Sequence, residues 1–265
     1  MLKKKVGNNN IRLAGLFVVL VFGLIILSIF FKFLLLVKNS KFDGNHRFTV
    51  GFVTKTSSNI ISFSPQNKSI SLLKISGNIA DKNLSRFLEI PVDVTIYNYN
   101  KFDNSKISPS LWKLFFDMGE HSNLNSYDLL RLVLYTQTVS GSSIYEKNIS
   151  ANDSEEDKQV LVSSLFQDTT INQENVSVEI INATSIYGLG NRLADLITRI
   201  GGNVVLVSSS DSSSKYSKIF YSKNKTYTVE KLGSFLGIVP QKSNQSGIAD
   251  VIIIIGQDKL GNLNF

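Results

Sequence analysis

The sequence predicts a mixed α/β protein attached to one membrane-spanning helix at its N-terminal end. Three observations lead to this prediction. Residues 13–37 form one continuous apolar segment. From residue 48 onward, segments in which apolar and polar residues alternate are interleaved with segments whose apolar residues recur at helical spacing. Between residues 176 and 258, such segments follow one another in the order β-α-β-β-α-β.

Residues 13–37 predict an uncleaved membrane anchor. The segment contains one charged residue, Lys32. As a helix it measures about 37 Å, more than the roughly 30 Å of a bilayer's hydrocarbon core. A cleaved signal peptide is disfavoured, because the apolar run is too long and no small-x-small cleavage motif follows it. Lys32 is close enough to the far end of the span for its ammonium group to reach the membrane surface.

The charges before the span predict its orientation. The first acidic residue of the chain is Asp43, and four basic residues precede the span: Lys3, Lys4, Lys5 and Arg12. Because cytoplasmic flanks carry the excess of Lys and Arg, residues 1–12 are expected in the cytoplasm and the remainder outside the cell membrane. The chain is therefore expected to be a single-pass protein with the lipid bilayer as a partner of residues 13–37.

The charge of the exported part disfavours nucleic-acid binding. The chain has 28 Lys and Arg against 21 Asp and Glu, a net charge of +7, but five of the basic residues lie in the first 37 positions, where there is no acid. The remaining 23 basic and 21 acidic residues leave only +2. A nearly neutral domain lacks the basic surface that DNA or RNA requires, so no nucleic-acid partner is expected.

The content of cysteine and histidine limits the chemistry of the chain. No cysteine is present, which excludes disulfides, thiol catalysis and thiolate metal sites, and which in an exported protein fits a bacterial surface. The two histidines, His46 and His121, stand far apart in unlike surroundings. Neither a metal site nor a Ser-His-Asp arrangement is predicted from them. We expect no catalytic residue, no bound metal and no cofactor.

Residues 48–150 are expected to form a small α/β domain after a polar stalk at 38–47. Alternation predicts strands from residue 48, at 60–65, at 69–76 and at 91–100, with Pro65 to Lys68 as a hairpin turn. Helical spacing predicts helices at 108–119 and 125–140, the second capped by Asn125 or Ser126. The single tryptophan, Trp112, is expected in helix packing, with stacking on a sugar or lipid as the alternative.

The hairpin sequence IISFSPQNKSISLLKISGNI resembles the early hairpin of LytR-CpsA-Psr domains. That family transfers undecaprenyl-pyrophosphate-linked glycopolymers onto bacterial cell walls, and arginines and aspartates on both sides of the hairpin hold the pyrophosphate and its metal. Here the matching segments are Thr54 to Asn59 and Lys74 to Asn78. In the first, Lys55 keeps a positive charge at a shifted place, and in the second, Ser76-Gly77-Asn78 supplies neither a guanidinium nor a carboxylate. The resemblance implies a shortened domain without transferase chemistry. The alternative is a ligase that uses Arg47, Lys55 or Arg86 in a substitute geometry.

A linker with a short helix is expected at 151–175, before the C-terminal unit at 176–258 and a tail at 259–265. Ser154 followed by three acids suits a helix N-terminus better than a calcium loop. In the C-terminal unit, strands are predicted at 176–183, 203–209, 217–222 and 249–256, and helices at 191–202 and 228–238. Such an order forms a sheet with two helices on one face, as in a ferredoxin-like sandwich.

Four ordered blocks of the C-terminal unit are similar to the LytR C-terminal domain. They are Val178 to Thr184, Gly188 to Ala194, Gly201 to Val205 and Val251 to Asp258. The resemblance implies a non-catalytic module that binds a cell-wall glycopolymer or another envelope protein.

The loop after the first strand of this unit is the candidate contact with an anion or a glycan, because glycines near a helix N-terminus expose backbone N–H groups. The candidate binding residues are Asn182, Thr184, Gly188, Gly190 and Arg192. A plain turn is the alternative, and a dinucleotide site is disfavoured because position 193 is Leu rather than Gly.

Overall fold

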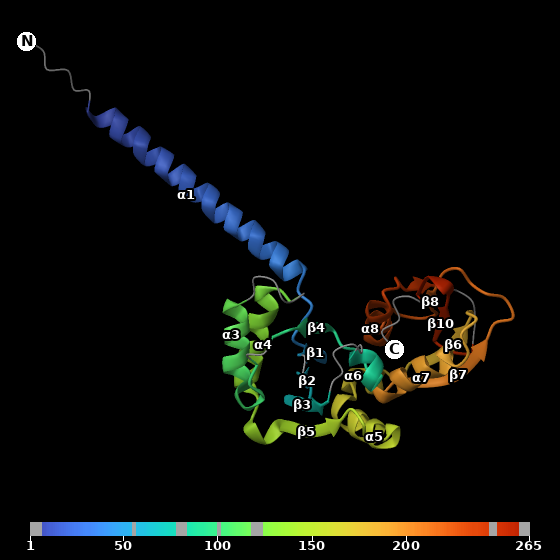
Figure 1. Ribbon diagram of the computed structural model, residues 1–265. Helices are drawn as coiled ribbons and strands as arrows, with labels where there is room; N and C mark the ends of the chain where they lie inside the picture. The colour runs from blue at the N-terminus through green and yellow to red at the C-terminus, as the bar shows by residue number, and fades with distance from the viewer. Residues whose placement is uncertain are drawn as a thin grey trace, which may run out of the picture.

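The computed structural model describes residues 7–54, 57–77, 84–99, 102–117, 124–243 and 248–259. The first element, α1 (Gly7–Lys38), is one straight helix that projects away from the rest of the chain (Figure 1). Within it, residues 12–38 are long and apolar enough to cross a membrane, and none of that window is buried in the protein. The predicted apolar helix is confirmed.

A five-stranded sheet forms the centre of the first domain. Its strands are β1 (Phe48–Val53), β2 (Ser57–Ser64), β3 (Ser69–Ser76), β4 (Val94–Tyr97) and β5 (Ile144–Ser150), in the order β4-β1-β2-β3-β5. β1, β2 and β3 pair antiparallel, whereas β4 lies parallel to β1 and β5 parallel to β3. The predicted hairpin is confirmed, with Ser64 opposite Ser69.

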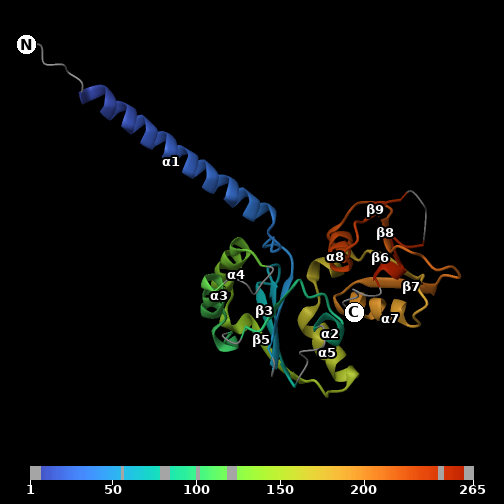
Figure 2. The ribbon, with the colours of Figure 1, turned by 45° about the horizontal axis from the view of Figure 1, so that its top comes forward.

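Helices cover both faces of this sheet (Figure 2). α3 (Ile107–Phe116) and α4 (Ser126–Thr138) pack with Ile61, Phe63 and Leu72 in one core. On the other face, α2 (Leu84–Leu88) and α5 (Glu155–Phe166) pack with Ile60 and Leu73. Because both faces are covered, side chains of either parity along β2 and β3 are buried, which explains their nearly continuous apolar composition.

The segments flanking this domain are more ordered than the sequence suggested. Residues 38–47, expected as a stalk, are fixed to the domain, and the Phe42 side chain is 1% exposed. Residues 151–175, expected as a linker with one short helix, contain α5 and α6 (Thr169–Glu174), and Phe166 and Ile171 are buried in the second core. Buried apolar side chains thus pack both segments against the domain.

The C-terminal domain contains the predicted order of strands and helices. The elements are β6 (Ser177–Asn182), α7 (Leu189–Arg199), β7 (Asn203–Ser209), β8 (Lys218–Tyr221), α8 (Tyr227–Leu236) and β10 (Val251–Ile255), with a two-residue strand β9 (Gln241–Lys242) before the last. Both helices pack in one core with the same face of the sheet, through Leu193 and Leu196 of α7 and Leu232 of α8.

The strand pairing differs from the ferredoxin-like arrangement that the sequence suggested. The sheet order is β7-β6-β10-β8-β9, and β6 lies parallel to both of its neighbours, β7 and β10. A ferredoxin-like sheet would place another strand between β6 and β7. Here the crossover through α7 returns directly to the neighbouring position, which the order of elements along the chain cannot reveal. The mixed α/β class itself is confirmed.

Candidate functional site

The loop after β6 brings the predicted binding residues together but uses their polar groups internally. The Asn182 amide donates to the carbonyl oxygen of Ile186 at 2.8 Å, and its side-chain oxygen accepts from the backbone N–H and the hydroxyl of Thr184, at 3.1 and 2.7 Å. The Thr184 hydroxyl accepts from the N–H of Ile186 at 3.2 Å. These bonds build the loop, so Asn182 and Thr184 are positioning residues for whatever the loop presents.

The two glycines have different structural roles. Gly188 is the N-cap of α7 with φ 78°, a conformation that L side chains rarely adopt. Gly190 lets the helix approach the sheet, because a Cβ there would lie 3.0 Å from the Val207 side chain. Arg192 donates its backbone N–H to the Gly188 carbonyl oxygen.

The same loop exposes an aromatic ring at one edge of the C-terminal sheet. Tyr187 is 99% exposed and Ile186 is 45% exposed. The carboxyl ends of the parallel strands β6, β7 and β10 meet here, and the N–H groups of Ser210 and Ser214 donate to the carbonyl oxygens of Asn182 and Ala183 at 2.9 Å. In open α/β sheets, ligands bind at this edge. A stiff loop that holds a tyrosine in solvent can stack it on a sugar ring or a partner surface.

Of the three residues of the alternative ligase hypothesis, the structure describes Arg47 and Arg86. Arg47 donates through Nη1 to the Ser62 hydroxyl at 2.9 Å and to the Leu165 carbonyl oxygen at 3.0 Å. Burial lowers the pKa of its guanidinium, an effect that the nearby Asp168 carboxylate opposes. Arg86 is exposed on α2. Lys55 lies outside the described residues, as does His121.

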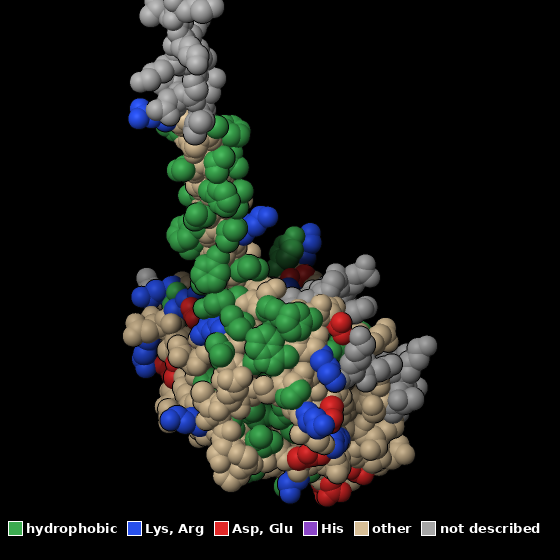
Figure 3. All heavy atoms as spheres, turned by 90° about the vertical axis from the view of Figure 1, so that its left-hand side faces the viewer, with side chains coloured by type: hydrophobic (Ala, Val, Ile, Leu, Met, Phe, Trp, Pro, Cys, Tyr) green, Lys and Arg blue, Asp and Glu red, His purple; other side chains and the backbone are tan. Residues whose placement is uncertain are grey.

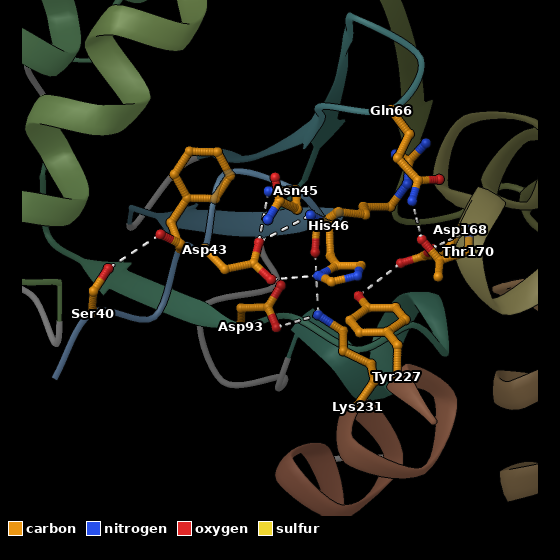
Figure 4. A network of polar contacts seen from close by, with 12 residues as sticks. Ser40, Asp43, Asn45, His46, Gln66, Asp93, Asp168, Thr170, Tyr227 and Lys231 are labelled. Atoms are coloured by element: carbon orange, nitrogen blue, oxygen red, sulfur yellow. Dashed lines mark hydrogen bonds and ion pairs between the residues drawn. The ribbon is translucent and has the colours of Figure 1, made fainter. Parts of the chain in front are cut away.

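A cleft of about 260 Å³ lies where the two domains meet. Polar contacts cross it from both sides (Figure 4). The Lys231 ammonium of α8 donates to Asp93 at 2.5 Å, and the other carboxylate oxygen of Asp93 accepts from the N–H of Thr49 at 2.8 Å. Beside them the His46 and Tyr227 rings are stacked with centroids 3.8 Å apart, and the Tyr227 hydroxyl donates to Asp168 at 3.0 Å.

Several ionisable groups of the cleft form hydrogen bonds with one another, and these contacts shift their pKa values. Burial raises the pKa of Asp43, but hydrogen bonds from His46 and Asn45 outweigh burial, so this pKa lies below its ordinary value. Burial, followed by the charge and hydrogen bond of Asp168, raises the pKa of Tyr227. The His46 ring bonds to Asp43 through Nδ1. This pattern suits a junction that fixes two domains, since the carboxylates of Asp43, Asp93 and Asp168 all accept hydrogen bonds from groups in the cleft.

Further contacts extend the junction on both sides of the cleft. Glu174 of α6 accepts from the backbone N–H groups of Tyr227 and Thr228 at 2.9 and 2.8 Å, at the N-terminus of α8. At the other end, the Arg199 side chain of α7 donates to the Leu88 carbonyl oxygen and pairs with Glu89. Within the part of the chain that the structure describes, no group of three or more His, Asp or Glu side chains is placed to hold a metal ion.

Sequence reasoning missed this junction. The stacked rings of His46 and Tyr227 come from residues 181 positions apart, and nothing local to either predicts the other. One local signal was available, because Asp43 accepts from the N–H groups of Asn45 and His46, a turn that aspartate commonly forms.

Comparison with known proteins gives one match to a family. The family described as "LytR cell envelope-related transcriptional attenuator" (LytR_C) matches residues 175–258, so the C-terminal domain is a LytR_C domain. No curated protein matches the chain. Among solved structures, the crystal structure of B. subtilis TagT is 13% identical and covers 85% of this chain and 91% of its own, with a TM-score of 0.19. Lin1025 from Listeria innocua is 14% identical, covers 68% and 87%, and also has a TM-score of 0.19.

Proposed function

We propose, from the LytR_C match at residues 175–258, that this chain is a single-pass cell-envelope protein whose exported LytR_C domain binds a cell-wall polymer or an envelope partner. The match is the observation that carries the proposal. It begins at residue 175 and does not include the first domain, so the resemblance of residues 48–150 to LytR-CpsA-Psr domains stays a prediction.

The helix α1 supports the anchoring part of the proposal. The 27-residue span contains an 18-residue window with mean hydropathy 3.0, and none of that window is buried in the protein. Transfer of such an apolar surface from water into lipid is strongly favourable, which supports membrane insertion. The basic residues before the window favour a cytoplasmic N-terminus. In Figures 1 and 2 the C-terminal domain lies beyond the first domain, away from α1, where a partner in the wall can reach it.

The edge around Tyr187 supports the binding part. It combines an exposed ring with a loop whose polar side chains are already satisfied, so little entropy is lost when a ligand binds. We assign no reaction to the chain, because the described charged groups of the junction are engaged with one another rather than directed at a substrate.

Binding to purified wall tests the proposal. The full chain, solubilised in detergent, is expected to sediment with insoluble peptidoglycan that carries its glycopolymers. Tyr187→Ala is expected to weaken retention by about tenfold, the effect of losing one central aromatic contact. Tyr145→Ala, which removes a 51% exposed tyrosine from β5, is the matched control and is expected to bind normally.

Two results would contradict the proposal. One is retention no greater than that of an unrelated detergent-solubilised membrane protein. The other is a transfer of glycopolymer from a lipid-pyrophosphate donor that Arg47→Ala or Lys55→Ala abolishes, which would establish the ligase instead.

A further inference from the structure

Three aromatic residues, Trp112, Phe115 and Phe116, form a partly exposed cluster on α3, within the first domain. The Trp112 ring stacks on Phe116 with centroids 6.0 Å apart and meets Phe115 edge to face at 5.6 Å. Phe116 is 78% exposed, whereas Leu111 and Leu114 on the opposite side of the helix are buried in the core. Trp112 and Phe115 are only partly buried where they pack against this core, and Phe116 extends the cluster into solvent. Exposed aromatic surface of this kind marks an interaction site.

The position of the cluster follows from the contacts of α4 with the membrane helix. The Asn125 side chain donates to the Leu36 carbonyl oxygen at 2.9 Å, and the Tyr127 ring meets the Phe33 ring edge to face at 5.8 Å. Phe33 and Leu36 belong to the window that can span a membrane. The first turn of α4 is thus at the level where α1 leaves the bilayer.

The cluster lies at that same level. α3 packs against α4, and the chain passes from the end of α3 at Phe116 to the start of α4 at Ser126 within ten residues. In Figure 1 the two helices lie beside the end of α1. Figure 3 shows hydrophobic side chains gathered on this face of the body, directly below the apolar helix.

We propose that Trp112, Phe115 and Phe116 insert into the outer boundary of the bilayer that α1 spans, so that the first domain rests on the membrane. The inference relies on the anchoring of the proposed function. Aromatic side chains favour the headgroup region, where the ring lies between the polar headgroups and the apolar acyl chains. Lys113 on α3 and Lys38 and Lys41 after the span are exposed, and they suit anionic headgroups at the same depth.

The single tryptophan of the chain makes the contact measurable. The full chain is reconstituted into vesicles of phosphatidylcholine and phosphatidylglycerol, with and without lipids brominated near the headgroup end of the acyl chain. Bromine quenches tryptophan emission only at short range. We expect the emission maximum of Trp112 in vesicles to lie at a shorter wavelength than that of the unfolded chain in denaturant. In the brominated vesicles, Trp112 is expected to lose most of its emission.

Matched variants separate insertion from mere tethering. In the double variant Trp112→Phe with Tyr187→Trp, the tryptophan is on the C-terminal domain and is expected to keep its emission. Phe116→Ser is expected to reduce the quenching of Trp112, whereas Val239→Ser, at an 82% exposed residue of the C-terminal domain, is expected to leave it unchanged.

The outcomes distinguish this inference from the proposed function. A chain that an alkaline wash releases from the vesicles has no anchor, and both proposals fail. A chain that resists the wash but whose Trp112 emission is unchanged by brominated lipid overturns the inference alone. In that case the cluster is free for a protein partner.

Discussion

Asp128→Ala is expected to lower the free energy of unfolding of the domains after α1 by about 3 kcal/mol, because several buried or partly buried donors lose their acceptor together. The Asp128 carboxylate is 0% exposed. One of its oxygens accepts from the Ser40 hydroxyl at 2.5 Å and from the N–H groups of Lys41 and Phe42 at 2.9 and 3.0 Å. Its other oxygen completes a capping box with Asn125 at the start of α4.

This carboxylate also joins the segment after α1 to the first domain. Without it, residues 40–42 lose three hydrogen bonds and keep the buried Phe42 side chain and the bond from Arg131 to the Phe42 carbonyl oxygen. Trypsin is expected to cut after Lys41 faster than in the unaltered chain. Chemical unfolding and limited proteolysis of the detergent-solubilised chain measure the two effects. Asp153→Ala, at an exposed aspartate that caps a turn, is the control and is expected to cost less than 1 kcal/mol. Equal effects of the two substitutions would show that Asp128 does not hold the segment.

Arg199→Ala is expected to cost about 3 kcal/mol and to separate the unfolding of the two domains. Arg199 is 7% exposed, Nη2 lies 2.6 Å from the Glu89 carboxylate, and Nη1 donates to the Leu88 carbonyl oxygen at 3.0 Å. Removal of the guanidinium leaves the Glu89 carboxylate, whose side chain is only 19% exposed, without its cationic partner. Because these groups join α7 to α2, one cooperative transition is expected to become two.

A double variant separates the ion pair from general damage. Glu89→Gln combined with Arg199→Met is expected to be about 1 kcal/mol more stable than the sum of the single effects implies, since neither partner is then left charged and buried. Lys223→Ala, which breaks a solvent-exposed pair with Asp250, is expected to change stability by less than 1 kcal/mol. Additive single effects together with one retained transition would contradict the role of this pair in the junction.

Local patterns predicted most of the elements and missed those that depend on tertiary contacts. The hairpin around Pro65 and the helices α7 and α8 follow from alternation or helical spacing, so they could be predicted. β5 could not be predicted, because its first five residues are exposed and its sequence lacks alternation. It forms a strand because it pairs in parallel with the edge of β3. The pairing of β6 with β7 and β10 likewise depends on where a crossover returns.

The candidate site shows the same division. Gly188 and Gly190 were predicted as contacts for an anion or a glycan, which stays a prediction. The structure shows why glycine is present, because one has a positive φ and the other packs closely against the sheet. Asn182 was predicted to contact a ligand, and in the structure its side-chain amide donates a hydrogen bond that shapes the loop. Tyr187 could not be identified from the sequence, because no local pattern reveals that its ring is exposed. The junction of His46 with Tyr227 requires two domains to be docked first.

The orientation of the chain in the membrane is the central claim, and one labelling measurement tests it most directly. The chain has no cysteine, so Tyr187→Cys and Lys4→Cys each provide one reactive thiol. With a membrane-impermeant maleimide on intact cells, Tyr187→Cys is expected to be labelled at once, and Lys4→Cys only after lysis. If Tyr187→Cys is labelled only after lysis while Lys4→Cys is labelled on intact cells, the LytR_C domain faces the cytoplasm and the proposed envelope role is wrong.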